Sequence, residues 1–110
     1  MTVFVDDMYQ YPMGRFNRMK MSHMIATTDD ELHAMTAAIG IARRWYQGDH
    51  YDVSMSKRAA AIAAGAVPVT LRQLSAMCAI RRRDGILPDD AVAAEQLWKI
   101  ATWASLKRRR

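Results

Sequence analysis

The sequence predicts an α/β (α+β) fold, in which a small sheet of three or four strands is covered by helices and followed by a helical C-terminal extension. The order of the segments predicts this class, because strand, strand, helix, strand and helix patterns precede a run of helices. Residues 19–26 alternate in the manner of a strand, and Thr28 and Thr70 each begin a helix pattern. The 110 residues are enough for one domain. We expect an α/β domain over residues 1–85, and a helix with a basic tail over residues 86–110 as part of the same globular unit.

The first strand is expected at residues 2–5, where β-branched and aromatic residues run together. Asp6 and Asp7 follow at the end of this strand. Carboxylates in this place suit a divalent cation, which prefers oxygen ligands, and they equally suit a turn or a helix cap. Because neighbouring strand side chains point to opposite faces, at most one of the two is expected to face a given site.

Residues 8–18 are expected to form a loop, since Pro12 and Gly14 interrupt regular structure. Aromatic rings alternate there with cations, a combination that stacks on a base and holds a phosphate. Arg15 is therefore a candidate ligand contact. The alternative is a surface loop whose rings pack on the core.

The second strand is expected at residues 19–26, with His23 in an otherwise apolar row beside Met21 and Ile25. A lone histidine in such a row is commonly a hydrogen-bonded core or edge residue. A catalytic role for His23 therefore depends on the presence of His50.

A helix is expected over residues 28–40, with a capping box at its start and Gly40 at its end. Residues 41–47 are expected to form a third strand or an extended approach to the polar stretch that follows. Its bulky pair, Trp45 and Tyr46, is assigned to the core.

Residues 47–58 are the most polar stretch, a turn that leads into an alanine-rich second helix capped by Ser54 or Ser56. His50 and Asp52 lie in this turn, between apolar or alanine-rich flanks. This is where chemistry or ligand contact is expected.

Lys57 and Arg58 lie in the first turn of that second helix, where the helix dipole disfavours positive charge by a few tenths of a kcal/mol to about 1 kcal/mol. A bound anion would reverse this cost. The two cations, Ser54 or Ser56 and the free backbone N–H groups therefore predict a phosphate or carboxylate site. The alternative is that both side chains bend away and pair with nearby carboxylates.

A short edge strand is expected at residues 66–69, followed by helices over residues 70–83 and from residue 89 to about residue 106. The last helix carries Trp98 and Trp103. These rings either pack back on the domain or form a contact in a homodimer.

The positive charge is concentrated in the C-terminal part of the chain. Residues 1–70 hold seven Lys/Arg and seven Asp/Glu, whereas residues 71–110 hold nine and four and supply the whole net charge of +5. The clusters at residues 81–83 and 107–110 either contact nucleic acid or form solvated helix ends. The single Cys78 excludes an internal disulfide and is expected to be buried.

No apolar run approaches the roughly 18 residues of a membrane span. Near the N-terminus, where a signal peptide has a basic region followed by a long apolar run, the sequence has Asp6 and Asp7. A cytoplasmic protein without a membrane partner is expected. The glycine-rich nucleotide loops and the zinc-protease and serine-hydrolase signatures are absent from the sequence.

A series of short motifs resembles a known family over about residues 2–75. The motifs are Val5-Asp6-Asp7, Ser22-His23, Glu31-Leu32-His33, Trp45-Tyr46-Gln47, His50-Tyr51-Asp52, Lys57-Arg58-Ala59 and Gly65-Ala66-Val67. They are similar to a small bacterial and phage family catalogued as a domain of unknown function, number four thousand and thirty-one of its series. The resemblance implies a family and, through it, a phage origin and a host cytoplasm as a hypothesis. It implies no activity, and the segment from about residue 85 looks like an addition to the family pattern.

The first functional hypothesis is an enzyme, a hydrolase or nuclease acting on a nucleotide or nucleic acid. His50 would be the general base or acid, and Asp52 would orient it or bind a divalent metal with Asp6 and His23. Lys57 and its neighbouring arginine would neutralise the phosphate.

The second hypothesis is a binding protein without turnover, in which the same cations hold a nucleotide or nucleic acid. His50 and Tyr51 would then supply hydrogen bonds and stacking. The third is a phage accessory protein that binds a host protein through the tryptophan-bearing final helix.

Overall fold

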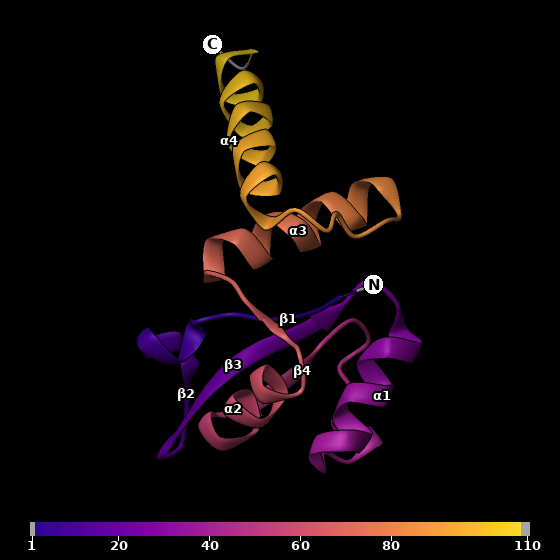
Figure 1. The fold of residues 1–110 in the computed structure, drawn as a ribbon. Coiled ribbons are helices and arrows are strands. Elements are labelled where there is room, and N and C mark those ends of the chain that lie inside the picture. The colour runs from indigo at the N-terminus through magenta and orange to yellow at the C-terminus, as the bar shows by residue number, and fades with distance from the viewer. Residues whose placement is uncertain (1, 109–110) are drawn as a thin grey trace.

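A computed structural model of the chain describes residues 2–108 (Figure 1). Arg109 and Arg110 of the predicted basic tail lie outside the described residues. The strands are β1 (Val3–Val5), β2 (Arg15–Phe16), β3 (Met19–Ala26), β4 (Tyr51–Ser54) and β5 (Val67–Pro68). The α-helices are α1 (Asp29–Ile39), α2 (Met55–Ala63), α3 (Leu71–Asp84) and α4 (Ala91–Arg108), and the 3-10 helices are η1 (Met8–Gln10), η2 (Pro12–Gly14) and η3 (Arg43–Trp45).

The described strands form one five-stranded sheet, which confirms the predicted α/β class. β3 is its centre and pairs antiparallel with β1, β2 and β4, while β5 pairs parallel with the other edge of β1. Helices α1 and α2 lie on one side of the sheet and α3 on the other (Figure 1). The sheet is thus buried on both faces, as two helical layers require.

Two core clusters follow from the alternation of side chains along the strands. Val5 and Met24 face α1 and α2 and are fully buried there. Phe4 and Ile25 face the other way and pack against α3. The predicted division of the β3 side chains between two faces is confirmed, and His23 shares the α3 face with Ile25.

The predicted helix limits are confirmed where caps set them. The Thr28 side chain accepts from the Glu31 backbone N–H, and Gly40 ends α1 in the left-handed conformation at φ 81°. Thr70 and Gln73 form a complete capping box at the start of α3. These contacts are local, so the sequence signal is direct.

Of the two alternatives for residues 41–47, the third strand is wrong. This segment contains η3, at which the carbonyls of Ala42 and Arg43 accept from the backbone N–H groups of Trp45 and Tyr46. Trp45 is 59% exposed, so its assignment to the core is also wrong, while Tyr46 does pack on the core. The strand is β4, in which Tyr51 and Val53 are buried and alternate with polar residues.

The expected loop at residues 8–18 contains more structure than predicted, since η1, η2 and β2 divide it. Phe16 is 67% exposed and does not pack on the core. The rings of Phe16 and Tyr11 are therefore available on the surface, whereas Tyr9 is half-buried.

Helix α4 crosses α3 near its own start and then extends away from the sheet toward the C-terminal end of the described chain (Figure 1). Ala94 and Trp98 pack into the core cluster on α3. The second half of α4 is mainly exposed, and Trp103 is 63% exposed. Within the described residues, no helix is both long and apolar enough to cross a membrane.

Candidate metal centre

Three polar residues form a row across β1, β3 and β4 on the face of the sheet that α3 covers. His23 is the direct cross-strand partner of Asp52. Asp6 follows the last paired residue of β1, and its backbone N–H donates to the carbonyl of His23 at 3.0 Å. Directly opposed residues on neighbouring strands have side chains within reach of each other. The register of the sheet therefore brings together residues that lie 17 and 29 positions apart.

Asp6 holds the His23 ring. Its Oδ2 lies 2.8 Å from His23 Nδ1, and its Oδ1 accepts from the backbone N–H groups of His23 at 2.8 Å and Met8 at 3.1 Å. Asp6 is fully buried, so its charge depends on these contacts. A carboxylate at Nδ1 favours the tautomer with the proton on Nδ1, which leaves the lone pair on Nε2.

Asp49 holds the His50 ring in the same way. Asp49 Oδ1 lies 2.6 Å from His50 Nδ1, and Arg81 of α3 lies 3.6 Å from the other oxygen of Asp49. His50 is two residues before Asp52, so the two side chains point to the same face of the chain. The local geometry again leaves Nε2 of the imidazole free.

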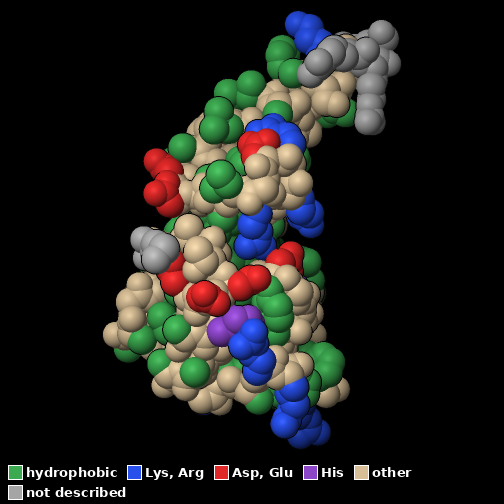
Figure 2. Space-filling view, turned by 90° about the vertical axis from the view of Figure 1, so that its right-hand side faces the viewer, with side chains coloured by type: hydrophobic (Ala, Val, Ile, Leu, Met, Phe, Trp, Pro, Cys, Tyr) green, Lys and Arg blue, Asp and Glu red, His purple; other side chains and the backbone are tan. Residues whose placement is uncertain are grey.

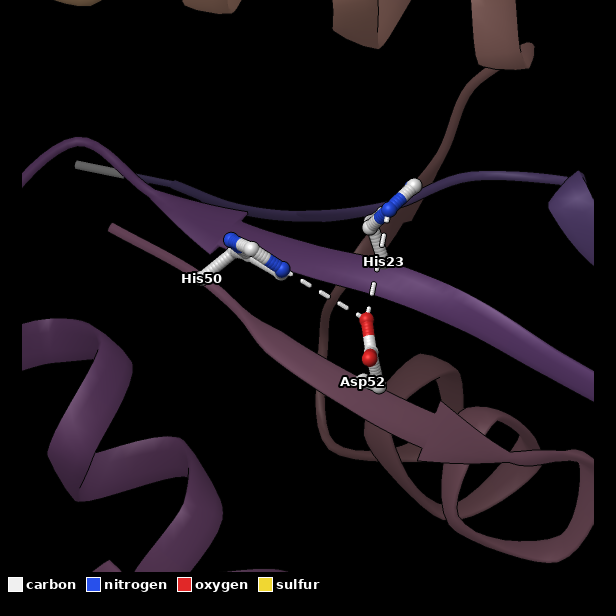
Figure 3. A group of neighbouring side chains, drawn as sticks. All are labelled: His23, His50 and Asp52. Carbon is white, nitrogen blue, oxygen red and sulfur yellow. Dashed lines mark ion pairs between the residues drawn. The ribbon is translucent and has the colours of Figure 1, made fainter. Parts of the chain in front are cut away.

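The free nitrogen atoms of both rings converge on one oxygen of Asp52 (Figure 3). Asp52 Oδ1 lies 3.5 Å from His50 Nε2 and 3.9 Å from His23 Nε2. This oxygen is buried and has no hydrogen-bond partner among residues 2–108. The other carboxylate oxygen accepts from Gln47 Nε2 at 2.7 Å.

This convergence requires positive charge at its centre. Two imidazole lone pairs and a carboxylate oxygen repel one another unless a proton or a metal cation lies between them. Candidate ligand atoms of His23, His50 and Asp52 all lie within 4.8 Å of one another. A buried polar atom without a partner is costly, and a bound cation removes that cost.

In the metal-free state, the carboxylates around His50 favour its protonated form. The Asp52 carboxylate raises the pKa of His50, burial opposes this effect, and Asp49 raises the pKa further. His50 in turn lowers the pKa of Asp52, burial opposes this, and the Gln47 hydrogen bond lowers it further. At 3.5 Å the contact between the two groups is long for a hydrogen bond, so we attribute the effect mainly to charge attraction.

The set of donors fits a divalent transition metal. Imidazole nitrogens suit Zn²⁺, Fe²⁺ and related ions, and two histidines with one carboxylate leave coordination positions open for water and substrate. Histidine ligands usually donate their second ring N–H to a carboxylate or carbonyl, as both rings do here.

The sequence-predicted residues divide into two groups. His23, His50 and Asp52 come together, and Asp6 contacts this group through His23. Asp7 lies elsewhere, since its Oδ1 accepts from the Leu71 backbone N–H at the start of α3 at 2.7 Å.

Tyr51 points away from this centre. It is fully buried on the α1 and α2 side, and its hydroxyl lies 2.7 Å from Nδ1 of His33. Tyr46 packs edge-to-face on His33 and donates its hydroxyl to the carbonyl of Gly48. This aromatic cluster anchors the turn that presents His50.

The predicted phosphate-binding residues have contacts within the protein. Ser54 caps α2 by accepting from the Lys57 backbone N–H, and Ser56 Oγ lies 3.3 Å from Ser54 Oγ. Lys57 Nζ donates to the carbonyl of Ile39 at 2.6 Å, and Arg58 Nε donates to the carbonyl of Asp6 at 2.8 Å. Phosphate binding by these residues stays a prediction.

Sequence reasoning missed three residues that support the site: Asp49, Gln47 and Arg81. Asp49 and Gln47 belong to the polar stretch at residues 47–58. The available signal was that Asp49 directly precedes His50 in this stretch. Arg81 carried no such signal, because its contact with Asp49 joins positions 32 residues apart.

The surface around this part of the molecule carries both signs of charge. Figure 2 shows histidine atoms reaching the surface beside carboxylates and next to lysine or arginine side chains. Arg81 lies 3.6 Å from the Asp49 carboxylate, and Arg58 donates to the backbone carbonyl of Asp6. Cations thus offset the acidic residues of the site.

Comparison with known proteins gave one family. The family model described as "Protein of unknown function (DUF4031)" matches residues 3–81. No curated protein and no solved structure matches the chain. The matched range includes every residue of the candidate metal centre and ends within α3, before α4 begins.

Proposed function

This chain belongs to the DUF4031 family, whose function is unknown, and we propose from its site that it is a divalent-metal-dependent hydrolase of phosphate esters. The observation that carries the proposal is the convergence of two imidazole nitrogens on a buried oxygen of Asp52 that has no hydrogen-bond partner. His23, His50 and Asp52 would hold the metal.

The chemistry divides between the metal and the chain. A metal in such a site lowers the pKa of a bound water and polarises a phosphoryl oxygen. Asp6 and Asp49 orient the two histidines and favour a proton on Nδ1 of each ring, so that Nε2 is the nitrogen directed at the metal. Gln47 holds the second oxygen of Asp52, which fixes the direction of its carboxylate.

Phosphate esters are the proposed substrates because of the charge around the site. Arg81 and Arg58 lie beside it, and the chain has a net charge of +5. A positive field concentrates anionic substrates near a site. A neutral substrate would gain nothing from it.

The proposal is tested by hydrolysis of p-nitrophenyl phosphate and bis(p-nitrophenyl) phosphate with added Zn²⁺, Mn²⁺, Fe²⁺ or Mg²⁺. Activity is expected in the wild type, lost with a chelator and lost in His50→Gln. His33→Gln is the matched control, since His33 is also hydrogen-bonded but lies on the other face of the sheet. Equal activity in His50→Gln and His33→Gln, or no hydrolysis with any metal, contradicts the proposal.

A second candidate function, binding of a partner protein, is favoured by the surface of α4. Five large apolar side chains of this helix are 59–64% exposed: Val92, Leu97, Ile100, Trp103 and Leu106. Figure 2 shows hydrophobic side chains at the surface of the upper part of the molecule. A contiguous exposed apolar surface commonly marks a protein interface, here with a second copy or a host protein.

Light scattering after size exclusion tests the dimer. A dimeric mass that becomes monomeric in Leu97→Glu supports it. A monomeric wild type at all concentrations contradicts a dimer through α4.

A further inference from the structure

A cavity of about 680 Å³ opens beside Asp52 and runs over the edge of the sheet. Its walls come from segments far apart in the chain: η2 and β2, the start of β3, η3 with its preceding turn, and β4 with the start of α2. Cavities of about 300–1,000 Å³ are typical of small-ligand sites. We call this cavity the β4 groove.

We propose that the β4 groove binds nucleotides, with the base stacked on its exposed aromatic rings and the phosphate directed to the metal centre. This inference rests on the proposed function and specifies its substrate class. Asp52 joins the two sites, because it is a metal-ligand candidate and also lines the groove.

Exposed rings from two separate segments line the groove. Phe16 of β2 is 67% exposed and Trp45 of η3 is 59% exposed. Exposed rings offer flat apolar faces on which a nucleic-acid base can stack. The guanidinium of Arg44 lies 5.4 Å from the Trp45 ring, so one side of that ring carries a cation that suits a phosphate.

The charge of the groove fits an anion. Its described lining contains three cations, Arg15, Arg44 and Lys57, and a single carboxylate, that of Asp52. Lys57 already donates to a backbone carbonyl, so it contributes positive potential. Arg15 and Arg44 are exposed at the surface and are the residues placed to contact phosphate.

Two further contacts shape the groove. Gln47 lines it and donates to Asp52 Oδ2, so the groove and the metal centre share a hydrogen bond. Gly14 also lines it, and a Cβ at this position would lie 2.2 Å from the carbonyl oxygen of Met8. Only glycine allows η2 to pack this closely on η1 and form the wall.

A nucleotide explains the combination better than a purely apolar ligand. An apolar ligand would leave the cations without a role, and a small anion would leave Phe16 and Trp45 uncovered. Aromatic rings interleaved with cations are the usual means of binding single-stranded nucleic acid without base readout.

The test measures fluorescence anisotropy of a fluorescein-labelled oligothymidylate with the full chain in a chelating buffer, so that bound strand is not hydrolysed. Trp45→Ala and Phe16→Ala are each expected to weaken binding about tenfold. Trp103→Ala is the matched control, since Trp103 is similarly exposed but lies on α4 outside the groove. The slope of the logarithm of the binding constant against the logarithm of the salt concentration is expected to become shallower by about one in Arg44→Gln. It is expected to stay unchanged in Arg82→Gln on α3.

Thymidine monophosphate as a competitor separates the two sources of the same chemistry. If thymidine monophosphate displaces the oligonucleotide at a concentration similar to that at which the oligonucleotide itself binds, the groove is assigned to free nucleotides. Binding of the strand without such competition assigns it to single-stranded nucleic acid, and either result supports the inference.

The inference is overturned if neither probe binds, or if Trp103→Ala weakens binding as much as Trp45→Ala. Its failure is distinct from failure of the proposed function. If the protein hydrolyses bis(p-nitrophenyl) phosphate but does not bind the oligonucleotide, the hydrolase proposal stands and nucleotide binding in the groove is rejected. If the protein binds the oligonucleotide but shows no metal-dependent hydrolysis, nucleotide binding in the groove stands and the hydrolase proposal is rejected.

Discussion

The buried Oδ1 of Asp52 lies opposite the Nε2 atoms of two histidines. It has no hydrogen-bond partner among the described residues. The fold holds this arrangement with its own contacts, since Asp6 and Asp49 fix the rings and Gln47 fixes the carboxylate. A structural histidine needs only one such contact. Two oriented rings that present free nitrogens to one carboxylate are better explained by a shared cation.

The titration of His50 tests the electrostatic part of this arrangement. Asp52 is the main cause of the raised pKa of His50, so Asp52→Asn is expected to lower that pKa toward its ordinary value. An NMR titration of the imidazole in metal-free protein measures it. Asp84→Asn, which removes an exposed carboxylate paired with Arg83, is the control and should leave His50 unchanged. An unchanged pKa in Asp52→Asn would show that the two groups do not interact.

The same pKa makes the stability of the metal-free protein depend on pH. Because the pKa of His50 is raised in the folded state, its contribution is fully present below its unfolded value of about 6.5 and is lost as pH rises through the folded pKa. His50→Gln should therefore cost more stability at about pH 5.5 than at about pH 9 in urea unfolding. The opposite order would mean that the folded state favours the neutral ring.

Replacement of Asp49 tests the role of the carboxylates behind the histidines. Asp49→Asn keeps the shape of the side chain but removes its charge from His50 Nδ1. The affinity for Zn²⁺ by calorimetry is expected to fall about 10- to 100-fold, as for other residues that orient a metal ligand. An affinity equal to that of the wild type would limit Asp49 to anchoring the turn.

At the scale of elements, Lys57 joins the end of α1 to the start of α2. Its ammonium donates to the carbonyl of Ile39, one of the last of α1, where a positive charge also suits the helix dipole. The positive charge that looked misplaced in the first turn of α2 thus serves another helix. This contact supplies a structural reason for Lys57 that the one-dimensional pattern did not contain.

Lys57→Met measures that contact. We expect a loss of about 1 kcal/mol in the free energy of unfolding, because the carbonyl loses a charged donor. Lys99→Met on α4 is the control, since Lys99 only approaches Glu95 at 3.9 Å and exposed pairs contribute little. A gain in stability in Lys57→Met would instead favour the predicted anion site, whose cation is unfavourable without its ligand.

Elements set by local contacts could be predicted from the sequence, and elements set by distant contacts could not. The capping residues Thr28 and Thr70 lie within three positions of their partners, so both helix starts were evident. The segment at residues 41–47 has strand-like composition, yet β4 occupies the remaining edge of β3. In β4 the buried residues Tyr51 and Val53 alternate with the polar residues Asp52 and Ser54, and these polar residues made the segment look like a turn. The same alternation directs Asp52 to the face of the sheet that carries the site.

The candidate site was predictable in its members but not in its geometry. His23, His50 and Asp52 could be singled out as residues, whereas the row from Asp6 to Asp52 depends on the register of three strands. The contribution of Arg81 depends on the packing of α3 over the sheet. Neither fact is contained in the spacing of residues along the chain.

At the scale of the whole molecule, the metal centre and the distribution of charge belong to different parts of the chain. The family match over residues 3–81 contains the centre, whereas residues 71–110 supply the entire excess of positive charge. Helix α4 lies beyond the match and extends the molecule, whose principal dimensions are 48 × 30 × 23 Å. The chain therefore combines a site that lies within the family match with a basic, apolar helix that offers a separate surface.

The central claim is that His23, His50 and Asp52 hold one divalent metal, and calorimetric titration of the metal-free protein with Zn²⁺ tests it most directly. We expect one ion to bind per chain, and we expect this binding to be lost in Asp52→Asn and retained in His33→Gln, since only Asp52 belongs to the centre. No saturable binding of Zn²⁺ to the wild type, or binding by Asp52→Asn with wild-type affinity, would contradict it.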